Sequence, residues 1–142
     1  MSISARDPEN RRLTRWLITG TGVSAFLAVF NLVYTSLSYE ESSPHMRWAF
    51  LFPLVFCAVP AALLLAAGGT FRIPRPAYNL WNGGVATLVC GCLFRGVVDI
   101  AGRSTDWDRY YYLLGAALMI VAIAIAAAAE LYRGRAETSR QV

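Results

Sequence analysis

Few residues in this chain of 142 have both the chemistry and the setting of a functional site, and the clearest are Arg95 and Asp99. Both lie in an otherwise apolar stretch, four positions apart. This spacing puts two side chains on one face of an α-helix, where a cation and an anion can pair. Because a charge in apolar surroundings is costly, such a pair either ties helices together or contacts a polar ligand. The sequence leaves both interpretations open.

Asn31 and His45 extend this candidate site. Asn31 lies at about the same depth in the first apolar segment as Arg95 does in the third, and His45 directly precedes the second. The candidate polar site therefore comprises Asn31, His45, Arg95 and Asp99. We expect it to form either a cavity that opens toward the outer side of a membrane or a polar surface for a partner on that side. A lone histidine needs ligands from another chain to hold a metal ion or haem, so no metal and no cofactor are predicted.

The other reactive residue types form no catalytic pattern. Cys57, Cys90 and Cys92 lie in apolar segments, and Cys90-Gly91-Cys92 differs from the C-x-x-C spacing of redox motifs. The sequence contains no phosphate-binding loop, nucleophile elbow or zinc-protease motif. The 13 cations are all arginine and are scattered among apolar runs, which argues against nucleic-acid binding. The sequence thus predicts a protein that is not an enzyme and binds no nucleic acid.

Composition indicates a membrane protein. The chain is 56% apolar and 15% charged, with a mean hydropathy of +0.44, whereas soluble domains are about 45–50% apolar and about 25% charged. Four apolar segments cover about 13–37, 48–67, 78–101 and 110–132. Each spans roughly 20–25 residues, enough to cross a hydrocarbon core as a helix. The predicted fold is all-α: one domain over 1–142, a four-transmembrane-helix bundle with antiparallel neighbours and short loops.

Local signals refine this prediction. Pro53 and Pro60 lie inside the second segment, and each removes a backbone donor. We therefore expect a kinked second helix whose freed carbonyls are bound by neighbours. Thr105 and Asp108 have the spacing of a capping box, which predicts the start of the fourth helix.

Small residues recur on one face of three segments. Such faces let membrane helices approach closely, which favours packing through Gly20, Ser24, Gly84 and Gly91. The first face comprises Gly20, Ser24, Ala28, Asn31 and Thr35; the third, Gly84, Thr87, Gly91, Arg95, Asp99 and Gly102; the fourth, Gly115, Met119, Ala122, Ala126 and Ala129. The alternative is that small residues are simply common in an alanine-rich chain.

Three stretches carry a resemblance to a family. They are Ser42-Ser43-Pro44 followed by Phe50-Leu51-Phe52-Pro53-Leu54, then Tyr78-Asn79-Leu80-Trp81-Asn82-Gly83-Gly84, then Asp99-Ile100-Ala101-Gly102. Together they resemble small bacterial four-span membrane proteins that are generally uncharacterised. The resemblance implies a bacterial inner-membrane protein and supplies no activity. Small multidrug transporters share the size, but the acidic residue of their first span is absent, and the dual topology of fluoride channels conflicts with the arginine distribution.

Two functions remain open for such a chain. The first is a non-enzymatic inner-membrane subunit, regulator or scaffold that acts through helix–helix association, with a second copy or another membrane protein as partner. The alternative is a small transporter or channel that uses a polar cavity around Arg95 and Asp99. A membrane enzyme or redox subunit is a third and weaker hypothesis, because no catalytic pattern supports it.

Arginine asymmetry predicts the topology. Nine arginines flank the segments on the side of the two tails and the second loop, and three lie on the other side. The nine are Arg6, Arg11, Arg12, Arg15, Arg72, Arg75, Arg133, Arg135 and Arg140; the three are Arg47, Arg103 and Arg109. The positive-inside rule then places both termini in the cytoplasm. Trp16 and Trp81 are expected at the inner membrane boundary, and Trp48 and Trp107 at the outer.

This topology can be tested by cysteine labelling. In a variant without native cysteines, Thr138→Cys should react with a membrane-impermeant maleimide only after the cells are opened, because the C-terminal tail is expected inside. Labelling of Thr138→Cys in intact cells would reverse the orientation.

Overall fold

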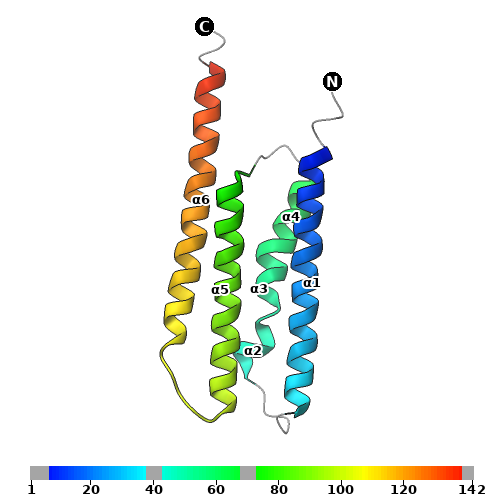
Figure 1. Ribbon diagram of the computed structural model, residues 1–142, viewed down its shortest axis with the longest axis vertical. Coiled ribbons are helices and arrows are strands. Elements are labelled where there is room, and N and C mark those ends of the chain that lie inside the picture. Colours follow the sequence, from blue (N-terminus) through cyan, green and yellow to red (C-terminus); the bar gives the residue numbers. More distant parts are fainter. Residues whose placement is uncertain (1–6, 38–42, 68–72, 139–142) are drawn as a thin grey trace.

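The computed structural model describes residues 7–37, 43–67 and 73–138, and they form four antiparallel helical segments (Figure 1). The first is α1 (Asp7–Leu37). The second is a bent segment made of α2 (Pro44–Trp48), α3 (Leu51–Pro53), the π-helical turn η2 (Leu54–Ala58) and α4 (Val59–Ala66). The third and fourth are α5 (Arg75–Ile100) and α6 (Asp108–Thr138). All four are long and apolar enough to cross a membrane, and no strand occurs among the described residues. The predicted all-α fold with a kinked second helix is confirmed.

The segments pack as two pairs. The bent segment packs along α1, and α6 packs along α5; α2 and α3 join the pairs by contacting α5. The start of α1 and the end of α6 lie at one end of the molecule, as Figure 1 shows. Within the described ranges, α6 has no neighbour comparable to α5. The bundle is therefore open along one side of α6.

The helix ends differ from the apolar boundaries. Helix α1 begins at Asp7 and α6 ends at Thr138, both beyond the apolar stretches, because backbone hydrogen bonding continues into the polar flanks. The capping-box prediction was wrong: α6 begins at Asp108, and the Thr105 hydroxyl accepts a hydrogen bond from the Trp107 N–H at 3.3 Å. Thr105 thus closes a turn before the helix.

The bend in the second segment is stabilised by neighbouring helices. Pro60 has no N–H to donate to the carbonyl of Phe56, four residues earlier, and the indole Nε1 of Trp81 donates to this carbonyl instead, at 2.7 Å. The carbonyl of Phe50, on the other side of Pro53, accepts a hydrogen bond from the Ser24 hydroxyl. The chain between the prolines adopts the π-helical turn η2. Helices α1 and α5 therefore satisfy carbonyls that the bend exposes, as expected.

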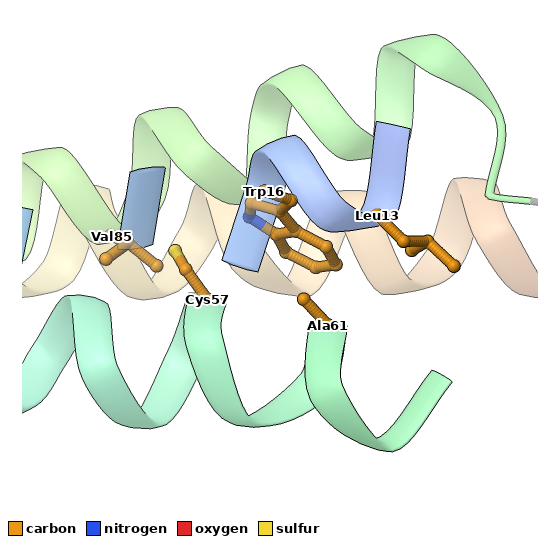
Figure 2. Packing of buried hydrophobic residues seen from close by; sticks show 5 residues of the cluster. All are labelled: Leu13, Trp16, Cys57, Ala61 and Val85. Carbon is orange, nitrogen blue, oxygen red and sulfur yellow. The ribbon is translucent and has the colours of Figure 1, made fainter. Parts of the chain in front are cut away.

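The core lies between α1, the bent segment and α5. It comprises Leu13, Trp16, Cys57, Ala61 and Val85, drawn in Figure 2.

Trp16 is buried and Trp81 is partly buried, and both are bound to neighbouring helices, which an aromatic belt does not require. The Nε1 of Trp16 donates to Asn82 Oδ1 at 2.8 Å, and the Trp81 indole is bound to Phe56 as described above. Both rings turn toward neighbouring helices because each finds a polar partner there. Trp48 and Trp107 are 57% and 70% exposed at the opposite end of the bundle, as residues of an aromatic belt would be.

Glycines set the closest helix contacts. A Cβ at Gly20 would lie 2.9 Å from Cys57 Cβ and 3.0 Å from the backbone N of Ala58, so α1 touches η2 there. A Cβ at Gly84 would lie 2.8 Å from the carbonyl O of Gly115 on α6. Lipid supplies no hydrophobic force between helices, and such close approaches are how membrane helices gain packing energy.

Adjacent glycines on α5 provide a direct test of this packing. Gly84→Ala should lower the free energy of unfolding by about 1–3 kcal/mol, because the added methyl meets α6 backbone. Gly83→Ala is the matched control: nothing lies within 4 Å of its Cβ position, so it should be neutral or stabilise by up to about 1 kcal/mol. Denaturation in mixed micelles measures both. Equal effects of the two changes would show that α5 and α6 are not in contact at Gly84.

Candidate functional site

The candidate polar site lies at the end of the bundle opposite the termini, where three elements meet. Arg95 and Asp99 are on the last two turns of α5. Ser43 and His45 come from the start of α2, and Asp108 is the first residue of α6. The segment that turns from α5 to α6 includes Gly102, whose φ of +67° suits glycine.

Arg95 connects α5 to the start of α6. Its Nε lies 2.9 Å from Asp99 Oδ1, the i, i+4 pair that the spacing predicts. The Nε–H is not aimed at this oxygen, so the contact is an ion pair without a hydrogen bond. Its Nη1 donates to the carbonyl O of Thr105 at 2.6 Å and lies 3.5 Å from Asp108 Oδ1. One guanidinium therefore contacts two carboxylates and a loop carbonyl.

Asp99 connects α5 to the start of α2. Its Oδ2 accepts a hydrogen bond from the Ser43 hydroxyl at 2.9 Å and lies 3.4 Å from His45 Nδ1. Ser43 stands at the N-cap position of α2, yet its hydroxyl makes no capping bond and is bound to Asp99. Both carboxylate oxygens of Asp99 thus have partners, one on its own helix and the other on α2.

The cluster is partly sheltered. The side chains of Arg95 and Asp99 are 27% and 26% exposed, that of His45 is 46% exposed, and Ser43 and Asp108 are buried. One arginine faces two carboxylates. Among the described residues, no three His, Cys, Asp or Glu side chains are grouped so that they could hold a metal ion. The geometry ties three helix ends together by charge.

The structure brings together three of the four predicted site residues. Asn31 is apart from them: it is partly buried on α1, and its side chain makes no hydrogen bond to any described residue. Equal depth in two helices does not make them neighbours, and α1 packs mainly against the bent segment. Sequence reasoning missed Ser43 and Asp108 as members of the site. Asp108 was interpreted as part of a helix cap, and Ser43 was noted as part of the family resemblance.

The predicted packing residues lie at helix contacts. Gly20 and Ser24 face the bent segment, and Gly84 faces α6. A Cβ at Gly91 would lie 2.7 Å from Tyr111 Cβ, so this glycine accommodates an aromatic side chain of α6. Gly96, not singled out from the sequence, receives Met46 of α2 in the same way.

The cysteines are free thiols. Cys57 donates to Asn82 Oδ1 at 3.5 Å, Cys92 lies 3.7 Å from the hydroxyl of Tyr112, and Cys90 is exposed. Cys57 and Cys92 are small buried packing residues with one polar neighbour each.

A groove of about 330 Å³ lies at the other end of the bundle. It is lined by Trp16, Pro60, Leu63, Leu64, Ile73, Ala77, Tyr78, Trp81, Ala122, Ile123 and Ala126. These residues come from α1, α4, α5 and α6 and the segment before α5, and only apolar atoms form its surface. It therefore differs in place and polarity from the cavity expected around Arg95.

No known family, curated protein or solved structure matches this chain. The geometry of the site is therefore the basis for judging its role.

Single charge removals should rank by the number of charged side chains that they leave without an opposite charge. Arg95→Leu leaves the carboxylates of Asp99 and Asp108 without the cation that both contact, and should lower the free energy of unfolding by about 1–3 kcal/mol. Asp99→Leu should cost less, because Arg95 keeps Asp108 and the Thr105 carbonyl. Arg103→Leu, at an exposed arginine of the same end, is the control and should be nearly neutral. A larger loss for Asp99→Leu than for Arg95→Leu would contradict the charge arrangement.

Proposed function

We propose that the protein is a non-enzymatic subunit, regulator or scaffold of a bacterial inner membrane that acts through helix–helix association. The observation that carries this proposal is the free side of α6. This helix packs along α5 through Gly115, Met119 and Ala122, and its opposite side is without a comparable neighbour among the described helices.

That opposite side of α6 is suited to another helix. Ala117, Val121, Ala124 and Ala128 follow a 4-3-4 spacing and are all exposed. We name these four residues the α6 outer face. Small residues at such spacing allow backbones to approach closely, which is the main source of helix association in lipid. A partner helix could therefore pack here without any change in the bundle.

The polar site supports the same proposal. The side chains of Arg95 and Asp99 contact Ser43, Thr105 and Asp108 of the same chain. A substrate would have to displace these internal partners, each of which holds a helix end. The partial exposure of His45 and Asp99 favours the alternative, a small transporter or channel, which would need a polar path leading from this cluster into the bundle.

The proposed topology has both termini on one side of the membrane. It is supported by the start of α1 and the end of α6, which lie at the same end of the bundle. The arginine asymmetry supports the cytoplasm as that side.

Photo-cross-linking tests the proposal in cells. A benzophenone amino acid at Ala124, in the α6 outer face, should give one discrete adduct with protein, either a second copy or another membrane protein. The same group at Val29, a 58% exposed position on α1, is the control and should give weak and diffuse products. Absence of a protein adduct at Ala124, with normal expression, would contradict association through α6.

A further inference from the structure

The apolar groove at the terminal end of the bundle is outside the proposed function and has its own geometry. Residues of α4, α5 and α6 line it, together with Trp16 of α1 and Ile73 before α5. The indole N–H groups of Trp16 and Trp81 donate to Asn82 and Phe56, away from the groove. Because no polar atom lines it, the groove suits a hydrocarbon chain.

A guanidinium stands at the mouth of this groove. Arg12 is one turn before Trp16 on the same face of α1. Its Nη1 donates to the carbonyl O of Ile73 at 3.1 Å, and its Cζ lies 4.5 Å from the ring centroid of Tyr78. Ile73 and Tyr78 are both lining residues, so Arg12 is fixed against the groove wall. Its Nη2 has no hydrogen-bond partner among the described residues.

Other cations gather at the same end. Arg11 and Arg15 lie beside Arg12 on α1, and Arg75 begins α5. None of the four makes an ion pair with a described residue, whereas Arg133 on α6 is paired with Glu130 at 2.8 Å. Among the side chains that the structure describes, these four arginines therefore give the mouth of the groove an excess of positive charge.

We propose that this groove binds one acyl chain of an anionic phospholipid, with the lipid phosphate at Arg12. The apolar lining fits the chain, and the unpaired arginines complement the phosphate. Basic pockets between membrane helices recognise acidic headgroups in this way. A second copy of this protein would bring its own arginines of the same end toward the mouth, so charge favours the lipid. The proposal holds for either orientation of the chain in the membrane.

Lipid titration of the purified full-length chain tests this site. In dodecyl maltoside micelles, dioleoyl phosphatidylglycerol should give a one-to-one adduct in native mass spectrometry and raise the melting temperature. Dioleoyl phosphatidylcholine, of equal chain length, should bind roughly five- to ten-fold more weakly, since it lacks net charge. Glycerol 3-phosphate, which has the charge and no chain, should not bind. Equal binding of the two lipids, or binding of glycerol 3-phosphate alone, would overturn the proposal.

Matched variants separate the contribution of the acyl chain to binding from that of the lipid phosphate. Arg12→Gln should reduce the preference for phosphatidylglycerol to near one, Arg12→Lys should retain it, and Arg103→Gln, at the opposite end, should leave it unchanged. Ala126→Leu narrows the groove and should weaken the binding of both lipids. Ala127→Leu, at an exposed neighbouring position that does not line the groove, should leave the binding of both unchanged.

Two results for the groove variants would overturn the lipid site. One is unchanged lipid binding by Ala126→Leu. The other is a smaller oligomer for Ala126→Leu but not for Ala127→Leu, which would assign the groove to a second copy. Both are independent of the cross-linking at Ala124.

Discussion

The bundle depends on one constraint of the lipid environment: a backbone carbonyl without a partner must be satisfied by a neighbour, because no water is available. Pro60 creates such a carbonyl at Phe56, and Trp81 binds it. The Ser24 hydroxyl binds the carbonyl of Phe50 near Pro53. These two bonds fix the bent segment against α5 on one side and α1 on the other. The prolines thus constrain the positions of α1 and α5, because each of these helices must bring a donor side chain to a freed carbonyl.

Close packing at glycines also fixes the helices relative to one another. Gly20 lets α1 touch η2, Gly84 and Gly115 let α5 touch α6, and Gly96 receives Met46. The Arg95 cluster adds ties at the ends of α2 and α6. Polar contacts occur at every level, including Trp16 with Asn82 in the half that consists mostly of apolar residues. This protein therefore holds its helices together by specific contacts and not by burial of a large core.

Sequence reasoning reached the fold and part of the site for identifiable reasons. Hydropathy and length predict the four spans, and the i, i+4 spacing predicts the Arg95–Asp99 pair. Each of these features is determined within one helix and does not depend on how the helices pack. The error over Asn31 has a different origin: periodicity shows which side of a helix is polar but not which helix it meets. The tryptophans show the same limit. Their position near a segment end suggests a belt, and only the location of Asn82 and of the Phe56 carbonyl turns them inward.

Helix α6 connects the two proposals. Ala122 and Ala126 form one wall of the groove, while Ala124 and Ala128 belong to the α6 outer face. At its first turn α6 is tied to Arg95 through Asp108, and at the level of the groove its main neighbour among the described helices is α5. A lipid chain in the groove would support α6 on the side of Ala122 and Ala126, away from its outer face. Occupation of the groove by lipid would therefore hold α6 more firmly in the position in which its outer face meets a partner helix.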